Sequence, residues 1–252
     1  MSNQEILVMI PTYNEKDSIG NLIKDLSNLD FKILIIDDNS PDGTADFVAS
    51  LDLPNIDILR RPSKQGLGNA YIAGIKYALD VLKGKWNLKY LVSMDGDGSH
   101  QVSDLSKMVS QIVRYPNACM FLGSRWIAGG GIRNWSKFRI TLSKAGTRYA
   151  RWALKFPITD LTGGFRIYPC KTLEQIDLNQ ITSNGYSYQI EMAYAIKHLN
   201  KEIIELPITF IERESGVSKM SSRVVIEAIW RVSKMGLSLR LRPNADKLHY
   251  VK

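Results

Sequence analysis

The 252-residue chain has few cysteines and no long apolar run. Its two cysteines, Cys119 and Cys170, lack C-x-x-C spacing and stand in apolar or strand-like surroundings. This argues against a disulfide framework and predicts buried free thiols, as in a reducing cytosol. No segment reaches the roughly 20 apolar residues that cross a bilayer, and the N-terminus shows no basic segment followed by an apolar one. We therefore expect a cytoplasmic protein without a transmembrane domain.

Two common nucleotide-binding motifs are also absent. No G-x-G-x-x-G follows the first apolar segment, and no G-x-x-x-x-G-K-[ST] occurs, which argues against a dinucleotide oxidoreductase and a P-loop nucleotidase. The chain has no low-complexity tract, internal repeat or Pro/Ser-rich linker, and 44% of its residues are hydrophobic. It is most simply one large domain with a full core.

Positive charge is in excess. The formal net charge is +8 and the isoelectric point about 9.4, which predicts an anionic partner. Nucleic acid, a membrane surface and a phosphorylated substrate all meet that description. Charge alone does not choose among them.

Apolar and amphipathic segments alternate through the first half of the chain. We predict strands at 6–10, 31–36, 56–60, 90–94 and 118–122, and helices at 18–26, 44–51, 68–83 and 104–113. This alternation favours an α/β fold with a mostly parallel central sheet flanked by helices on both faces. Later in the chain we expect a helix from 185 to 199 and a strand from 202 to 211.

Two of these strands run directly into carboxylates. The strand at 90–94 leads to Asp95 and Asp97, and the strand at 31–36 leads to Asp37 and Asp38. The carboxyl ends of parallel strands are the usual binding edge of an open sheet, and paired carboxylates there suit Mg²⁺ or Mn²⁺ with a phosphate-bearing substrate. The alternative is that Asp-Gly-Asp-Gly-Ser is simply a turn.

Basic and aromatic residues accumulate in the second half. Around the glycines at 129–131, a loop expected to be mobile, stand Arg125, Arg133, Lys137, Arg139 and Lys144. Such a cluster suits a clamp on phosphate, with Arg125 the best single candidate because it directly follows a predicted strand. Surface solvation is the preferred interpretation of the two lysines.

Three further segments carry candidate site residues. Asp160 to Arg166 predicts either a substrate-facing turn or an ordinary hairpin. Gln189 or Glu191 is placed to point into a site from the first turn of its helix, although acidic residues also favour helix N-termini for electrostatic reasons. The glycine-containing turn between Arg213 and Lys219 suits an anion.

Residues 221–252 form a basic tail. From 221 to 241 the pattern is amphipathic, with Val225, Ile229, Val232 and Met235 near one face and Arg223, Arg231 and Lys234 elsewhere. We expect either a helix lying on anionic lipid headgroups or a terminal helix packed on the core with solvated charges. The expected division is therefore a catalytic domain at 1–220 and this tail.

Read in order, the motifs resemble those of the polyprenol-phosphate (dolichol-phosphate) mannosyltransferases, within the family 2 glycosyltransferases of the GT-A fold. The resemblance covers nearly the whole chain. It rests on Pro11-Thr-Tyr-Asn-Glu15, Asp37-Asp-Asn-Ser-Pro-Asp-Gly-Thr44, Gly66-Leu-Gly68, Asp95-x-Asp97, Gly123-Ser-Arg125, Arg139 with Ser143, Gly163-Gly-Phe-Arg166, Tyr188-Gln-Ile-Glu191 and Arg213-x-x-Gly216-x-Ser218-Lys219-Met220.

The resemblance implies a role for each matching residue. The donor, a sugar nucleotide, would be held by Pro11, Tyr13, Glu15, Asp38, Asp42 and Lys219; the metal by Asp95, Asp97 and Ser99; and the lipid phosphate by Arg125, Arg139 and Ser143. Arg213 and Lys219 would neutralise phosphate charge near the transferred sugar. Asp97, Arg125, Arg139 and Arg213 are the residues expected to act most directly in catalysis.

The implied reaction is metal-dependent transfer of mannose from GDP-mannose to a polyprenyl phosphate, with inversion to a β-linked product. A phosphate monoester has a second pKa of about 6, so it is already an anionic nucleophile at pH 7 and needs no general base. The family usually reads Asp-Ala-Asp-Leu-Ser-His where this chain has glycines at 96 and 98, which bears on loop rigidity. The chain resembles the soluble members, which work at the cytoplasmic membrane face through peripheral helices or a separate anchoring subunit.

Two rival functions stay open at this point. A relative that transfers glucose from a UDP donor to undecaprenyl phosphate would keep the same metal and phosphate residues. A non-catalytic nucleic-acid binder would use the +8 charge, but paired carboxylates in the sheet crevice would repel a phosphate backbone, so nucleic acid is not an expected partner.

Overall fold

Alternating strands and helices build this fold, as the hydrophobic pattern predicts. The computed structural model describes residues 2–185, 187–212, 222–241 and 249–252. Its strands are β1 (Ile6–Thr12), β2 (Lys32–Asp37), β3 (Ile56–Arg60), β4 (Tyr90–Ser93), β5 (Met120–Ser124), β6 (Gly131–Arg133), β7 (Arg166–Pro169), β8 (Ile203–Pro207) and β9 (Thr209–Ile211). Its α-helices are α1 (Lys16–Ser27), α2 (Thr44–Ser50), α3 (Leu67–Tyr77), α4 (Lys83–Trp86), α5 (Val102–Ile112), α6 (Lys137–Leu154), α7 (Cys170–Leu173), α8 (Ser187–Lys197) and α9 (Ser222–Leu241).

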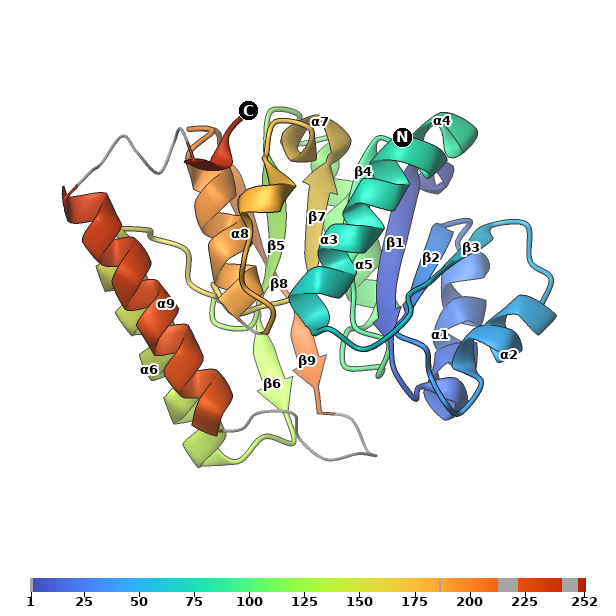
Figure 1. Ribbon diagram of the computed structural model, residues 1–252, viewed down its shortest axis with the longest axis horizontal. Coiled ribbons are helices and arrows are strands. Elements are labelled where there is room, and N and C mark those ends of the chain that lie inside the picture. Colours follow the sequence, from blue (N-terminus) through green and yellow to red (C-terminus); the bar gives the residue numbers. More distant parts are fainter. Residues whose placement is uncertain (1, 186, 213–221, 242–248) are drawn as a thin grey trace.

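Seven strands form one sheet in the order β3-β2-β1-β4-β7-β5-β8 (Figure 1). The pairs β1–β2, β2–β3, β1–β4 and β5–β8 are parallel, whereas β7 lies antiparallel between β4 and β5. Because β7 is antiparallel, its first residue lies at the same edge as the carboxyl ends of its two neighbours. The predicted mostly parallel α/β fold is confirmed.

Two apolar layers cover the two faces of the sheet. Residues of α1, α2 and α5 pack on one face, and residues of α3, α6 and α8 pack on the other. The central strands are buried on both sides: all five residues from Ile6 to Ile10 have no exposed surface. Near-continuous apolar strands are what a sheet covered on both faces requires.

Local details differ from the sequence-based expectations in three places. The predicted strand at 202–211 is two strands, because the chain turns at Ile208, which is buried, and β9 leaves the main sheet to pair with β6. The expected glycine loop at 129–131 thus leads into a short strand. Helix α1 begins at Lys16, before the expected cap Ser18, because the Lys16 N–H is bonded by Asp42 from another loop at 3.1 Å.

The last long helix, α9, packs beside α6 (Figure 1). Val232 is buried, and a Cβ on Gly236 would lie 2.8 Å from the carbonyl oxygen of Ala153, so the two helices approach closely there. The hydroxyls of Tyr149 and Ser233 share a hydrogen bond of 2.6 Å. Among the described residues, no helix has the length and apolarity needed to span a bilayer. Of the residues that the sequence pattern placed on one face, Val232 and Met235 pack against the core, whereas Ile229 is 49% exposed.

Candidate active site

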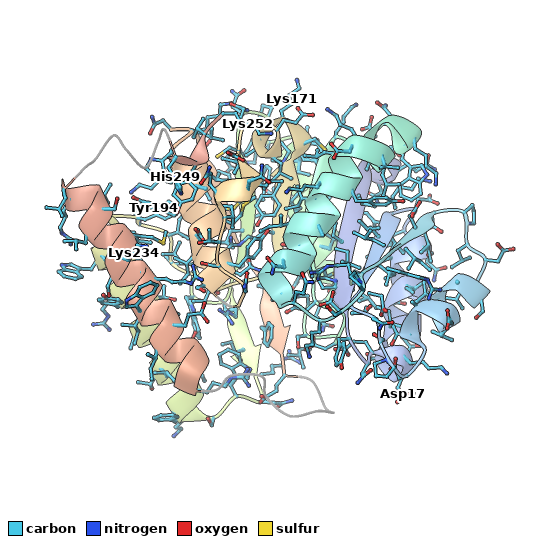
Figure 2. All side chains as sticks on the ribbon, viewed as in Figure 1. Asp17, Lys171, Tyr194, Lys234, His249 and Lys252 are labelled. Atoms are coloured by element: carbon cyan, nitrogen blue, oxygen red, sulfur yellow. The ribbon has the colours of Figure 1, made fainter. Side chains whose placement is uncertain are left out.

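The candidate site lies along the edge where the parallel strands end. Asp17, near the start of α1, marks this edge, while Lys171 and Lys252 mark the opposite one (Figure 2). The loops that follow β1, β2, β4 and β5, and the turn that precedes β7, all reach this edge. These loops carry the predicted site residues, as expected for an open α/β sheet.

Asp95 and Asp97 occupy the loop after β4. The Asp95 N–H donates to His100 Nδ1 at 3.1 Å, and the Ser99 N–H donates to Asp97 Oδ1 at 3.1 Å. Gly98 has φ +76°, a left-handed conformation that favours glycine in this turn. The loop is thus held by its own hydrogen bonds, while about a third of the Asp95 side chain stays exposed.

His100 lies at the centre of the site. Its ring stacks on Phe165 at 4.6 Å between centroids and is buried. Burial lowers the pKa of His100, while the charges of Asp95 and Asp97 raise that pKa and the Arg125 cation lowers it. His100 Nδ1 lies 3.8 Å from Asp95 Oδ2, and the rings of His100 and Phe210 lie 5.5 Å apart. The Arg125 guanidinium lies 5.6 Å from the same Phe210 ring, so the carboxylates after β4 and the cation after β5 face one site.

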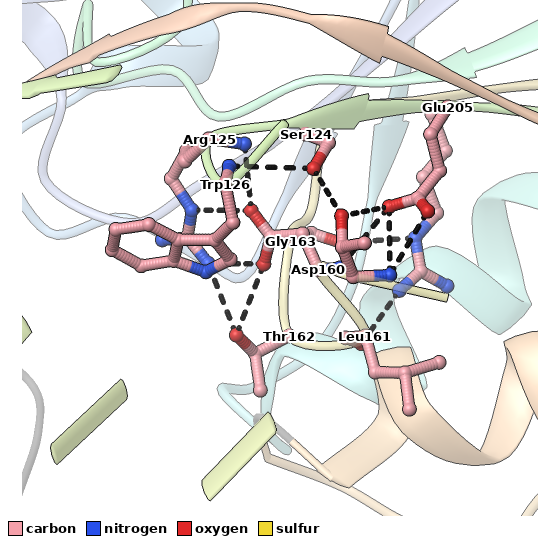
Figure 3. A network of polar contacts seen from close by, with 10 residues as sticks. Ser124, Arg125, Trp126, Asp160, Leu161, Thr162, Gly163 and Glu205 are labelled. Carbon is pink, nitrogen blue, oxygen red and sulfur yellow. Dashed lines mark hydrogen bonds and ion pairs between the residues drawn. The ribbon is translucent and has the colours of Figure 1, made fainter. Parts of the chain in front are cut away.

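Arg125 is held in a buried ion pair with Asp160 (Figure 3). The backbone N–H and Nε of Arg125 donate to Asp160 Oδ2 at 3.0 and 2.7 Å, and Nη2 donates to Oδ1 at 2.6 Å. Nη2 also donates to the Thr162 hydroxyl at 3.0 Å. This bidentate geometry fixes the plane of the guanidinium. Among the described residues these bonds use N, Nε and Nη2, which leaves Nη1 for a ligand.

A second set of hydrogen bonds holds the turn that carries Asp160 (Figure 3). Glu205 on β8 accepts from the N–H of Thr159 at 2.9 Å and from the N–H of Asp160 at 3.2 Å. The hydroxyls of Ser124 and Thr159 share a hydrogen bond of 2.9 Å. The turn that carries Asp160 is therefore attached to both β5 and β8.

Arg139 and Arg125 both lie near the ring of Trp135. The Arg139 guanidinium lies 3.9 Å from the ring centroid of Trp135, and the Arg125 guanidinium lies 5.4 Å from the same ring. Arg139 also forms an ion pair with Glu212, which follows β9. Ser143 is one helical turn further along α6 and partly exposed. The structure thus gathers the three residues expected to bind the acceptor phosphate on one side of the site.

The loops after β1 and β2 form the other side. Asp38 is buried and pairs with Arg61, with an Nη1–Oδ1 distance of 2.5 Å. Burial raises the pKa of Asp38, although the Arg61 cation lowers it in part. Tyr13 is partly exposed, and the Lys64 ammonium lies 3.9 Å from its ring centroid. The Asp38 N–H donates to the carbonyl of Thr12, the neighbour of Tyr13, at 3.1 Å. These two loops therefore offer a ligand an aromatic surface and a carboxylate that accepts hydrogen bonds.

Two other predicted donor residues make structural contacts. Asp42 accepts hydrogen bonds from the Lys16 N–H at 3.1 Å and from the Thr44 N–H and hydroxyl at 2.9 and 2.6 Å. Burial alone would raise the pKa of Asp42, but these hydrogen bonds and the Lys16 charge outweigh it and lower the pKa. The N–H of Glu15 donates to the Thr44 hydroxyl at 3.1 Å. Asp42 therefore holds the starts of α1 and α2 together.

The family model described as Glycosyl transferase family 2 matches residues 7–177. The chain belongs to this family. The resemblance drawn from the order of the motifs is confirmed, and the non-catalytic nucleic-acid binder is not favoured.

Two relatives match over most of the chain. The undecaprenyl-phosphate mannosyltransferase of Micrococcus luteus is 41% identical over 239 residues, which cover 93% of this chain and 95% of the relative. The polyprenol monophosphomannose synthase of Mycolicibacterium smegmatis is 39% identical over 243 residues, which cover 94% and 89%. Among solved structures, glucosyl-3-phosphoglycerate synthase from Mycobacterium tuberculosis has a TM-score of 0.68 at 13% identity and covers 91% of this chain and 79% of that one. This last likeness concerns the fold.

The predicted residues of this glycosyltransferase fall into three groups. Those that would hold metal and lipid phosphate converge, and those of the donor line the loops of β1 and β2. Arg213 and Lys219 lie outside the described residues. Sequence reasoning did not find Arg61 or Trp135, because nothing in their local pattern marks them. It named Asp160 as part of a turn but not as the partner of Arg125.

Proposed function

We propose that this chain transfers mannose from GDP-mannose to a polyprenyl phosphate, with inversion at the anomeric carbon, giving polyprenyl phosphomannose. The observation that carries the proposal is a site in which His100 and Phe210 link the loop of Asp95 and Asp97 to Arg125, and Trp135 links Arg125 to Arg139. Carboxylates suit a metal-bound diphosphate, and arginines suit a second phosphate group. Two relatives named for polyprenyl-phosphate mannosyl transfer, at 41% and 39% identity, support the choice of substrates.

A divalent metal is part of this proposal, and the donor set fits Mg²⁺ or Mn²⁺. Within the described part of the chain, no three His, Cys, Asp or Glu side chains gather as a metal cage. Two carboxylates, Asp95 and Asp97, with the Ser99 hydroxyl nearby, suit a hard ion that keeps waters and takes its other ligands from substrate phosphates. When bound, the ion would neutralise charge on the departing diphosphate. A fold neighbour with a TM-score of 0.62 was crystallised with Mn²⁺ and uridine diphosphate.

The protein's own groups would orient the acceptor. The acceptor phosphate is largely a dianion at pH 7, so no residue is required to remove a proton. Nη1 of Arg125 and the guanidinium of Arg139 would hold it, and Ser143 would add a hydroxyl donor. Because Asp160 fixes Arg125 in one orientation, little rearrangement is needed when the phosphate arrives. Arg213 and Lys219 keep their proposed role beside the diphosphate.

A transfer assay tests this function directly. Radiolabelled GDP-mannose and UDP-glucose are each incubated with polyprenyl phosphate, with and without Mn²⁺ or Mg²⁺, and label in the lipid phase is counted. We expect metal-dependent label from GDP-mannose and its loss in Asp97→Asn. Asp57→Asn, which changes a carboxylate on β3 that pairs with Lys85, is the matched control. Label only from UDP-glucose would reject the proposed donor while keeping the acceptor chemistry.

We also propose that α6 and α9 rest on the membrane that holds the acceptor. At 100° per residue, the exposed apolar residues of α9 fall within about 120° of its circumference. They are Ile226, Ile229, Trp230, Leu237 and Leu241, and α6 adds Phe138 and Trp152. The Arg240 guanidinium lies 5.0 Å from the Trp152 ring, and exposed basic residues at 148, 151 and 155 line a surface hollow beside that ring. An apolar face bordered by cations suits anionic lipid headgroups.

Vesicle flotation tests this membrane contact. We expect Trp230→Ser and Leu237→Ser each to weaken binding to anionic vesicles roughly tenfold, from the apolar area that each side chain would bury. Val113→Ser changes an equally exposed apolar residue at the end of α5 and serves as the control. Equal flotation of all three variants and the wild type would contradict the proposed face.

A further inference from the structure

One buried side chain at the candidate site has no hydrogen-bond partner. Gln189, in the first turn of α8, is 2% exposed, and neither its Oε1 nor its Nε2 has a partner among the described residues. Buried amides are nearly always hydrogen-bonded, so an isolated one calls for an explanation. A leucine or methionine would fill the same space without desolvating an amide. The residue is therefore poorly explained by packing alone.

Its neighbour on the same helix shows the contrast. Glu191 is buried to a similar degree, but its Oε2 accepts from the N–H groups of Thr182 and Ser183 at 3.2 and 2.8 Å. Its Oε1 accepts from the Tyr250 hydroxyl at 3.1 Å. Of the two residues that the sequence pattern offered for this helix, Glu191 has a structural role and Gln189 has unused hydrogen-bonding capacity.

The Gln189 amide faces the candidate active site. A Cβ on Gly164 would lie 3.3 Å from Gln189 Nε2, and the same point is 3.8 Å from both Asp95 Oδ1 and His100 Cε1. Gly164 has no side chain to fill that point. The amide, the carboxylate and the imidazole therefore border one small space beside the loop that follows β4.

The backbone around this space is tightly held. Arg166, fully buried, donates from Nε to the Gly163 carbonyl at 2.9 Å and from Nη1 to the Gln189 carbonyl at 2.7 Å. The Ser93 hydroxyl donates to the Gly164 carbonyl at 2.6 Å, which ties the turn to β4. The backbone at Gln189 and Gly164 is thus held in place before any ligand binds, which limits where the Gln189 side chain can reach.

The order of strands indicates which part of a ligand would reach Gln189. Along the site edge, Asp38 follows β2, Asp95 follows β4, Gly164 precedes β7 and Arg125 follows β5. If Asp38 faces the nucleoside, Asp95 the diphosphate and Arg125 the acceptor phosphate, the transferred sugar lies between the last two. Gln189 lies next to this position, between Asp95 and Arg125. This step rests on the proposed function.

We propose that the Gln189 side chain binds a hydroxyl group of the transferred sugar. An amide both donates and accepts hydrogen bonds, as a hydroxyl does, and carries no charge, so it matches a sugar better than a phosphate. His100 beside it accepts a hydrogen bond at Nδ1 from the Asp95 N–H at 3.1 Å. Gln189 thus contributes to the choice of sugar, separately from residues that bind nucleoside or phosphate.

The test compares Gln189→Met, which keeps length and apolar bulk, with the control Gln4→Met at an exposed position. We expect kcat/KM for the sugar nucleotide to fall 10- to 100-fold in Gln189→Met, while affinity for the nucleoside diphosphate alone, measured by calorimetry, stays unchanged. The melting temperature should be equal or higher, because an unpaired buried amide has been removed. Gln4→Met should match the wild type.

Monodeoxy analogues of the donor identify the contact. For the wild type, kcat/KM should be 10- to 100-fold lower with one of the deoxy analogues than with the complete donor. Gln189→Met should transfer from that analogue and from the complete donor with similar kcat/KM. A variant that transfers as well as the wild type, or that loses donor and nucleoside diphosphate binding together with stability, would overturn the inference. Absence of transfer by the wild type from both GDP-mannose and UDP-glucose would reject the proposed function, and this inference with it.

Discussion

Replacing Asp160 by asparagine tests the central ion pair of the site. The side chains of Arg125 and Asp160 are 7% and 0% exposed, and three hydrogen bonds from Arg125 end on this one carboxylate. The Asp160→Asn variant keeps the shape but leaves the guanidinium buried without a counter-charge. Breaking a buried pair in this way costs about 3 to 5 kcal/mol.

The expected change in melting temperature follows from the size of the protein. At about 2.1 cal/mol/K per residue, a chain of this length has an unfolding entropy of roughly 530 cal/mol/K, so the melting temperature should fall by roughly 6 to 9 °C. Differential scanning calorimetry measures this shift. The variant should also raise KM for polyprenyl phosphate more than KM for the sugar nucleotide, because Arg125 loses its fixed orientation.

The matched control is Asp46→Asn. Asp46 forms an ion pair with Arg60 at 2.7 Å, so the two groups are of the same types as Asp160 and Arg125. The side chains of Asp46 and Arg60, however, are 79% and 54% exposed. Exposed pairs contribute about 0 to 1 kcal/mol, so the melting temperature should move by no more than about 2 °C. Equal shifts in the two variants would refute the reasoning that burial makes Asp160 essential. The double variant Arg125→Met with Asp160→Asn should cost less than the sum of the single changes, since no charge is left unpaired.

Four further predictions follow from other contacts. Burial raises the pKa of Cys119 to about 11 and of Cys170 to about 12, so at pH 8 both thiols should resist iodoacetamide until the protein unfolds. Because both pKa values exceed that of an exposed thiol, about 8.5, the free energy of unfolding should fall as the pH rises from about 8.5 through 11, which denaturant titrations measure. Glu212→Gln should lower KM for polyprenyl phosphate several-fold, since Glu212 now competes with the phosphate for Arg139, and an unchanged KM would contradict this. Gly68→Ala should lower the melting temperature by several degrees, because its Cβ would lie 2.2 Å from a backbone carbonyl oxygen just before α8, and a melting temperature like that of the wild type would show that the loop yields.

Much of the fold follows from the sequence because its signals are local. Apolar segments five or six residues long predict β1 to β4, and the carboxylates that follow two of them predict the site edge. Contacts between distant residues are not visible in this way. Lys16 begins α1 because Asp42, 26 residues away, bonds its N–H, and this moves the helix start away from the expected Ser18.

The same limit applies to the candidate site. Arg125 and Asp160 each stand in a recognisable motif, but 35 residues separate them, and only the antiparallel placement of β7 brings the turn before it to the end of β5. Gln189 and Glu191 look alike as candidates in the sequence. Burial and hydrogen bonding separate them, and neither property can be predicted from two residues of one helix turn.

The strand order also bears on how substrate preferences can change. Loops after β2 and after β5 are four strand spacings apart, which is roughly 19 Å at the usual distance between neighbouring strands. Substitutions that far apart, without shared contacts, usually act additively. Under the proposed function, a change beside Asp38 that alters the preferred base and a change on α6 that alters the preferred lipid should therefore combine without penalty. The two preferences are free to evolve, or to be engineered, one at a time.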